Sequence, residues 1–190
     1  MGVEYNPEMV ALATREAERQ GVAAAAKFVK ADIFETDFSQ ATIITMYLLP
    51  NLNLKLRPKI LDLKPGTRIV SHAFDMGDWK PDNTVTAEGR NAFLWIVPAK
   101  VTGTWQSTFG ELVLKQNFQN VEGSLKSGTG TVQISNGRIN GDQISFSAGL
   151  SQYTGRVANG SIDGTAKGAT SGAWSATLRS DNPVSSPKIQ

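Results

Sequence analysis

Two acidic residues, Glu4 and Asp32, stand where two short strand-like runs end. Glu4 ends the first run, Asp32 follows the run at 27–31, and Asn6 with Pro7 opens a helical pattern between them. A strand, a helix and a second strand form the repeating unit of a parallel sheet, whose strands end at one edge. Two carboxylates at the carboxyl ends of neighbouring parallel strands are what a doubly wound sheet offers to a nucleoside ligand. The two acids therefore predict a nucleoside site in a doubly wound sheet.

The first half of the chain must position these acids, and it alternates strand-like and helical patterns. The helix after Glu4 has Asn6 as its cap, Pro7 at its first position and Gly21 at its stop. The apolar run at 41–47 is nearly continuous, which is typical of a parallel strand covered on both faces. The other elements expected in this half are a helix over 52–63 that is broken or kinked at Pro58, a strand at 67–72, and a hairpin of 84–87 with 92–98 across 88–91.

The second half is rich in Gly, Ser, Thr and Asn and shows no helical pattern. Short alternating runs at close spacing, separated by tight turns, predict a small antiparallel β-barrel or sandwich. We expect Trp105 and Trp174 to plug it and to close its first strand on its last. The expected strands are 101–109, 111–118, 120–126, 130–135, 138–140, 143–148, 153–158, 161–166 and 172–179. The dipeptides typical of hairpin turns are Asn136-Gly137, Asn140-Gly141 and Asn159-Gly160.

Composition excludes several classes of site. The 190 residues include no cysteine and one histidine, so thiolate chemistry and a histidine-rich metal site are excluded, and we expect no metal. The net charge of +2 comes from scattered charges, which argues against a nucleic-acid partner. No run approaches a membrane span and the first residues form no export signal, so we expect no membrane partner and a cytoplasmic chain, unless a preceding segment supplies a signal. We divide the chain into residues 1–98, 99–180 and a disordered tail at 181–190.

Four segments carry a resemblance to a known family: GVEYNP at 2–7, FVKADIF at 28–34, ATIITMYLLP at 41–50 and LKPGTRIVSH at 63–72. With them, residues 2–98 resemble the later part of a class I S-adenosylmethionine-dependent methyltransferase, in the branch of seven-strand protein lysine methyltransferases. Residues 99–190 are similar to the β-domain appended to some bacterial members. The resemblance implies a Rossmann-like sheet and methyl transfer to a protein or small-molecule acceptor.

The resemblance also implies roles for single residues. The cofactor contacts that it implies are Glu4, Tyr5, Asp32, Ile33, Phe34 and Thr45. Glu4 would accept from the ribose hydroxyls, and Asp32 would accept from the adenine amino group. The catalytic positions that it implies are Tyr47, Pro50 and His72, with Tyr47 orienting a neutral lysine. Phe74 and Trp79 would line the substrate entrance beside His72.

In the complete fold of this family the first strand is central, between the second and the fourth, and it carries a glycine-rich loop. The sequence shows no counterpart of either, so we expect an N-terminally truncated methyltransferase domain. S-adenosylmethionine binding by this chain alone would be weak or absent, and activity would require that the strand and loop be supplied. The open slot could instead pair two copies of the chain as a homodimer. The alternative function is a non-enzymatic binding module that uses the β-domain, with the half-Rossmann region as a relic or a dimerisation surface.

Each singled-out residue also has an ordinary structural interpretation. Glu4 could be a simple strand-end carboxylate, and Asp32 could cap the turn that follows it. Tyr47 could be a packed aromatic, His72 a hydrogen-bonded rim residue, and Trp79 a cover for the sheet edge. The polar residues that could line either a binding mouth or a solvated strand face are Gln116, Asn117 and Gln119.

Overall fold

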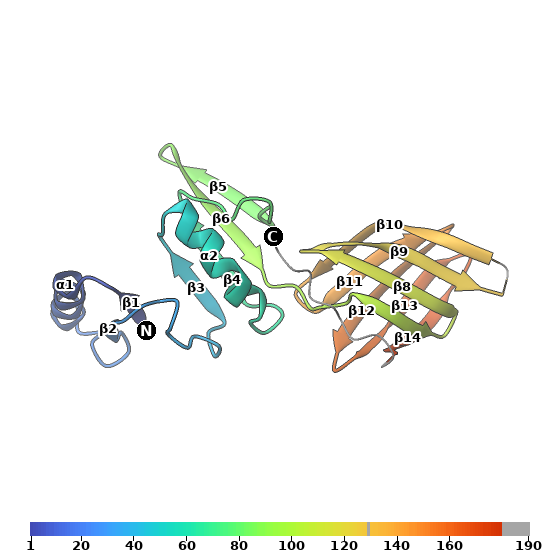
Figure 1. Cartoon of the computed structure of the whole chain (residues 1–190), viewed down its shortest axis with the longest axis horizontal. Coiled ribbons are helices and arrows are strands. Elements are labelled where there is room, and N and C mark those ends of the chain that lie inside the picture. The colour runs from blue at the N-terminus through green and yellow to red at the C-terminus, as the bar shows by residue number, and fades with distance from the viewer. Residues whose placement is uncertain (129, 180–190) are drawn as a thin grey trace. The chain divides into compact units, whose positions relative to one another are not determined.

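The computed structural model describes residues 1–128 and 130–179 (Figure 1). Contacts within the chain group it into two compact units, Met1–Gln40 and Ala41–Gln190. The division predicted at residue 98 falls inside the second unit, between a four-stranded sheet and a barrel. The tail predicted at 181–190 lies outside the described residues.

The first unit is a strand, a helix and a second strand. These elements are β1 (Gly2–Glu4), α1 (Pro7–Arg19) and β2 (Phe28–Lys30). The helix begins as predicted, because the Asn6 side chain accepts a hydrogen bond from the Glu8 amide and Pro7 stands at the first position. β1 and β2 pair in parallel, with Glu4 opposite Lys30. Both strands therefore end at the same edge.

The second unit begins with a four-stranded sheet and one helix. These elements are β3 (Ile43–Met46), α2 (Pro50–Leu61), β4 (Arg68–His72), β5 (Asn83–Ala87) and β6 (Arg90–Ile96). The strand order is β3-β4-β6-β5, and only β3 and β4 pair in parallel. The predicted hairpin turns at Glu88-Gly89, where both residues have positive φ. The expectation that both faces of β3 are covered is wrong within the described residues, since Ile43 and Thr45 are exposed and only the alternate residues are partly buried.

Helix α2 runs through Pro58 without a break, so of the two predicted effects of this proline the break is wrong. A proline inside a helix removes one hydrogen bond, here to the carbonyl of Leu54. Asn53, Leu56 and Ile60 are buried on one face of α2, and this packing stabilises the helix across the missing bond.

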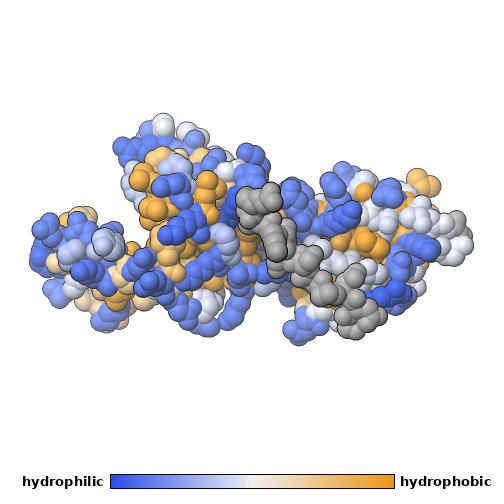
Figure 2. Space-filling model, viewed as in Figure 1, coloured by the Kyte–Doolittle hydropathy of each residue, from blue (hydrophilic) through white to orange (hydrophobic). Residues whose placement is uncertain are grey.

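Apolar side chains are also exposed over β3 and α2 (Figure 2). Ile43, Leu49 and Leu54 are each between 43% and 58% exposed. An exposed apolar surface of this kind is typical of an interaction site. It includes Leu49, which follows Tyr47 by two residues and directly precedes α2.

Eight antiparallel strands close into a barrel. They are β7 (Gly103–Ser107), β8 (Gly110–Asn117), β9 (Asn120–Ser127), β10 (Gly130–Asn140), β11 (Gln143–Ala148), β12 (Ser151–Ala158), β13 (Ser161–Gly168) and β14 (Gly172–Leu178). Each strand pairs with its neighbours in sequence, and β14 pairs back onto β7 with Leu178 opposite Trp105. The sequence predicted either a barrel or a sandwich, and the structure has a barrel.

One predicted turn in the second half is wrong. The strands expected at 130–135 and 138–140 are the single strand β10, and Asn136-Gly137 lies inside it at a shift in the pairing with β9 and β11. Asn136 has φ 51°, and a Cβ on Gly137 would lie 2.1 Å from the Val121 carbonyl oxygen. A bulge and a hairpin turn can need the same residue types, so the dipeptide alone did not distinguish them.

The other two turn dipeptides lie at real turns. Asn159 and Gly160 connect β12 to β13 with φ values of 48° and 75°, as a two-residue hairpin turn of the predicted kind requires. The turn between β10 and β11 consists of Gly141 and Asp142, one residue later than the predicted dipeptide.

Side chains fill the interior of the barrel. Trp105 and Trp174 are buried, and their indole N–H groups donate to the carbonyls of Val101 and Thr154. Their predicted role as plugs is confirmed. The other large side chains of this core are Leu112, Leu114, Val121, Leu125, Ile134, Ile139, Ile144, Phe146, Tyr153 and Ile162.

The turn between β8 and β9 contacts the sheet of the same unit. Phe118 in this turn has φ 53° and stacks on Trp79, with ring centroids 5.8 Å apart. The Arg57 guanidinium lies 5.2 Å from the Phe118 centroid and pairs with Asp78, and its hydrogen bond holds the pKa of that carboxyl below its usual value. A left-handed conformation costs a non-glycine residue about 1–2 kcal/mol, and the aromatic and cation–π contacts offset a cost of that size.

Gly164 allows a close approach of strands in the barrel, and its replacement tests this packing. A Cβ at this position would lie 1.9 Å from the Thr154 carbonyl oxygen. We expect Gly164→Ala to lower the free energy of unfolding by about 3 kcal/mol, because backbone atoms cannot yield as a flexible side chain can. Urea unfolding followed by tryptophan fluorescence measures the change.

The matched control is Gly128→Ala, since a Cβ there would meet nothing within 4 Å. Its free energy of unfolding should stay within about 0.5 kcal/mol of the parent chain. Equal stability of the Gly164 and Gly128 variants would contradict the close approach.

Candidate active site

The carboxylate of Glu4 lies where β1 passes into α1. Glu4 is exposed, and its Oε1 accepts a hydrogen bond of 2.8 Å from the Asn6 amide. Its backbone carbonyl accepts from the Ala31 amide at 3.1 Å, which continues the pairing with β2. A negative charge near the first turn of a helix is stabilised by the helix dipole. The strand end and the helix start thus hold the carboxylate in one place.

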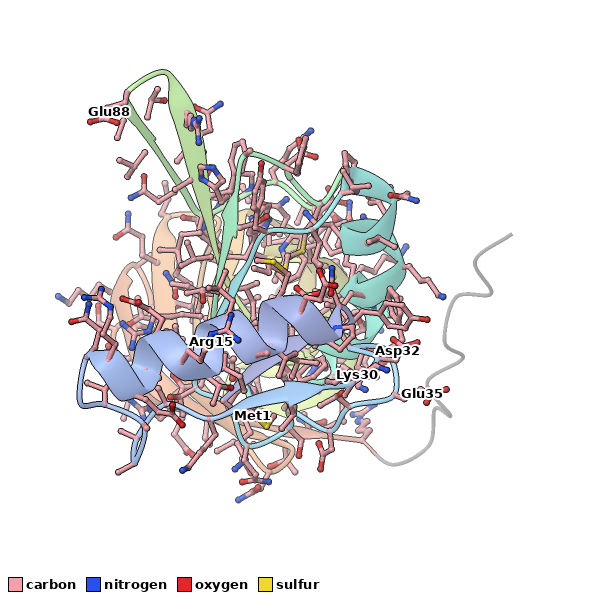
Figure 3. The ribbon with its side chains drawn as sticks, turned by 90° about the vertical axis from the view of Figure 1, so that its left-hand side faces the viewer. Met1, Arg15, Lys30, Asp32, Glu35 and Glu88 are labelled. Carbon is pink, nitrogen blue, oxygen red and sulfur yellow. The ribbon has the colours of Figure 1, made fainter. Side chains whose placement is uncertain are left out.

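Asp32 follows the end of β2 and caps a turn. Its Oδ1 accepts from the Phe34 amide at 2.8 Å, and its carbonyl accepts from the amide and hydroxyl of Thr36 at 2.9 and 2.7 Å. This is the ordinary interpretation of Asp32, and Glu35 belongs to the same turn, because its amide donates to the Asp32 carbonyl at 3.2 Å. Figure 3 shows Asp32 with Lys30 and Glu35 at the same end of the first unit.

The register of the parallel pair brings the two acids to one edge. Glu4 lies opposite Lys30, so Asp32 stands two residues beyond the partner of Glu4. Within the described residues each carboxylate uses one oxygen in a hydrogen bond and leaves the other available. Two such acceptors can receive the hydroxyl and amino donors of a nucleoside. Of the other residues named for the cofactor, Tyr5 is 77% exposed, and Ile33 and Phe34 are partly buried.

A second group of side chains lies at the ends of β3 and β4. The rings of Tyr47 and His72 meet edge to face with centroids 4.8 Å apart, and Tyr47 stacks on Phe74 at 6.1 Å. Tyr47 is 68% exposed. Thr45 is exposed on β3, and Pro50 is the first residue of α2. The structure therefore brings Tyr47, His72 and Phe74 together as one aromatic group, in which Tyr47 is exposed and the other two are partly buried.

Sequence reasoning missed the residues that support this aromatic group. The chain turns sharply after β4, where Ala73 has φ 65°, and the Ser71 hydroxyl donates to the Phe74 carbonyl at 2.6 Å. The buried Asn53 of α2 donates to the same segment. The sequence feature that could have identified Asn53 is its spacing. It lies three residues before Leu56 and seven before Ile60, on the same buried face of the helix.

Three residues suggested for binding surfaces are structural instead. Trp79 is buried between Trp95 and Phe118, so it cannot line a substrate entrance. Gln116 donates to the carbonyls of Ala99 and Phe118 and accepts from the Val101 amide. Gln119 is buried and donates to the Lys80 carbonyl at 2.7 Å. Asn117 is exposed.

No helix in the described part of the chain is long and apolar enough to cross a membrane. No group of three or more His, Asp or Glu side chains that could hold a metal ion occurs among residues 1–128 and 130–179.

Comparison with known proteins gives a consistent family for the first part of the chain. The family model of the ANTKMT methyltransferase domain matches residues 1–83. A protein-lysine N-methyltransferase of Saccharolobus islandicus is 45% identical over 92 residues, which are 48% of this chain and 57% of that protein. The adenine nucleotide translocase lysine N-methyltransferase of Mus musculus is 29% identical over 111 residues, which are 58% of this chain and 48% of that protein.

A solved structure agrees with these relatives. It is an RNA methyltransferase from Salinibacter ruber in complex with S-adenosyl-L-homocysteine, with 46% sequence identity and a TM-score of 0.51. The similarity covers 53% of this chain and 66% of that chain.

Residues 1–83 therefore belong to a family of S-adenosylmethionine-dependent methyltransferases. Within that class, the domain they match is the ANTKMT methyltransferase domain. The chain spans about half the length of the curated relatives it matches.

The Asn6 side chain caps the helix that follows Glu4, and removal of the cap tests its contribution to the first turn. We expect Asn6→Ala to destabilise the first turn of α1 by about 1 kcal/mol, because the Glu8 amide loses its acceptor. Hydrogen exchange at Val10, whose amide donates to the Asn6 carbonyl at 3.1 Å, measures the effect. Asn6→Asp keeps an acceptor and should exchange like the parent. Similar exchange in the Ala variant would show that the cap does not hold this turn.

Proposed function

We propose that this protein is an S-adenosylmethionine-dependent methyltransferase that modifies a lysine of a protein acceptor. The observation that carries the proposal is the parallel register of β1 and β2, which brings Glu4 and Asp32 to one edge in a segment that matches a methyltransferase domain. Curated relatives that act on protein lysine support the choice of acceptor.

The parallel strand pairs support a Rossmann-like ancestry for both sheets. β1 and β2 pair in parallel with α1 between them in sequence, and β3 and β4 pair in parallel with α2 between them. A strand, a helix and a parallel strand form the repeating unit of a Rossmann-like fold. We infer that each unit contains one such repeat.

The proposed cofactor residues address the adenosine half of S-adenosylmethionine. Glu4 would accept from the ribose hydroxyls, and Asp32 from the adenine amino group. The residues of the same unit that would complete this contact are Tyr5, Ile33 and Phe34. The cofactor supplies a methyl group on a sulfonium, so the acceptor amine forms a bond to carbon as the bond from sulfur to carbon breaks.

The aromatic group of Tyr47, His72 and Phe74 is the proposed acceptor site, with Pro50 at the start of the adjoining helix. An aromatic face attracts the ammonium of a lysine side chain, which would lose its proton to water before the transfer, and the methylammonium that the transfer forms. Methyl transfer to an amine depends on alignment and on exclusion of water more than on acid or base strength. Tyr47 would therefore act by orienting a neutral lysine.

Calorimetric titration with S-adenosylhomocysteine and with adenosine tests the cofactor site. We expect weak binding of both, with dissociation constants near about 1 mM, or roughly −4 kcal/mol. The two dissociation constants should be similar, because Glu4 and Asp32 would contact only the adenosine part, which both ligands contain. Glu4→Ala and Asp32→Asn should each weaken binding at least about tenfold, as expected for hydrogen bonds to charged groups.

Asp32→Asn is preferred to alanine because it keeps the oxygen that accepts from the Phe34 amide. Glu35→Gln is the matched control, since Glu35 is an exposed acid of the same turn. Binding that is absent at millimolar ligand, or equal in all variants, would contradict the proposed site.

A further inference from the structure

We propose that Asn53 is a positioning residue of the acceptor site, whose buried amide holds the segment with His72 and Phe74 against Tyr47. The inference deepens the proposed function and rests on it for the chemical role of the aromatic group. The contacts that carry it lie within the second unit.

The amide nitrogen of Asn53 is surrounded by acceptors from the segment after β4. Nδ2 lies 3.3 Å from the Ser71 hydroxyl, 3.3 Å from the Phe74 carbonyl and 3.0 Å from the Asp75 carbonyl. Asn53 itself is completely buried. Hydrogen bonds shielded from water are strengthened by the low local dielectric. One side chain therefore contacts the chain at Ser71, Phe74 and Asp75, on both sides of the turn at Ala73.

The backbone in this segment has a conformation that is unfavourable for residues other than glycine. Ala73 has φ 65°, and the Phe74 amide folds back to donate to the His72 carbonyl at 2.8 Å. Residues other than glycine keep such a conformation only when the surroundings impose it. The donors from Asn53 and from the Ser71 hydroxyl, 2.6 Å from the Phe74 carbonyl, impose it here.

Asn53 also belongs to the segment that begins at Tyr47. Its backbone amide donates to the Leu49 carbonyl at 3.0 Å and closes the first turn of α2. Leu49 follows Tyr47 by two residues, so Asn53 contacts both chain segments from which the aromatic group is built. The pairing of β3 with β4 brings Tyr47 close to His72, and the Asn53 contacts then fix the segment that carries Phe74 beside them.

The two ends of the Asn53 amide differ in their contacts. Oδ1 is buried and has no hydrogen-bond partner among the described residues. A buried acceptor without a partner lowers stability. The contribution of Asn53 therefore comes from the donors on Nδ2, and these are the groups that Asn53→Asp removes.

The single histidine of the chain gives a direct test, because it contributes one set of imidazole NMR signals. The edge contact with Tyr47 shifts these signals, and Tyr47→Leu defines their position without it. We expect Asn53→Asp, which has the same shape but lacks the donors, to move the His72 signals toward that position. Exchange of the Phe74 amide should become roughly tenfold faster.

The matched control is Asn51→Leu, because Asn51 is exposed on the same helix. It should leave the His72 signals and the Phe74 exchange unchanged. Ser71→Ala removes the other donor to the Phe74 carbonyl and should act like Asn53→Asp if that variant folds poorly. Spectra are recorded well below the melting temperature of each variant, so a general loss of stability would not move the signals.

Unchanged His72 signals and unchanged exchange in Asn53→Asp and Ser71→Ala would overturn the proposal. Failure of the parent chain to bind S-adenosylhomocysteine would contradict the proposed function and would leave these signals as they are. The two failures are therefore distinguishable.

Discussion

Parallel pairing of strands is the constraint on which the candidate site depends. When two neighbouring strands run in the same direction, the residues that follow both of them are delivered to one edge. β1 with β2 does this for Glu4 and Asp32, and β3 with β4 does it for Tyr47 and His72. In each unit a pair of three- to five-residue strands thus gathers residues that lie 25 to 28 positions apart in sequence. The chemistry proposed here follows from those two pairings.

The two units differ in how they hold their strands. The barrel closes on itself and is filled by a core of tryptophan, leucine and isoleucine side chains, so every strand has a partner on both sides. The sheet of the second unit is attached to the barrel by the stack of Trp79 on Phe118 and by the Gln119 side chain. In the first unit Ala17 is the only fully buried residue. The barrel therefore supplies stability to the aromatic group of its own unit, and the carboxylates depend mainly on local hydrogen bonds.

Local chemistry explains which features the sequence predicts correctly. The start of α1 depends on Asn6, Pro7 and Glu8, which are close together in sequence, and the structure has the predicted cap. The barrel follows from short alternating runs and from tight turns such as Asn159-Gly160. The choice of Glu4 and Asp32 also depended on neighbours in sequence, and their common edge follows from the strand register.

The features that the sequence did not predict depend on partners far along the chain. Trp79 is buried because Phe118 stacks on it, and the sequence pattern around Trp79 does not predict that contact. Asn136-Gly137 forms a bulge because the Val121 carbonyl approaches from a neighbouring strand. The role of Asn53 appears only when the turn at Ala73 is known, since its donors reach residues more than 17 positions away.

Backbone NMR of the amides that donate to the two acids tests the central claim most directly. The Asn6 amide reports on the Glu4 carboxylate, and the Phe34 amide reports on that of Asp32. On addition of S-adenosylhomocysteine, both signals should shift together with the same dissociation constant. Signals that do not move, or of which only one moves, would contradict a shared adenosine site.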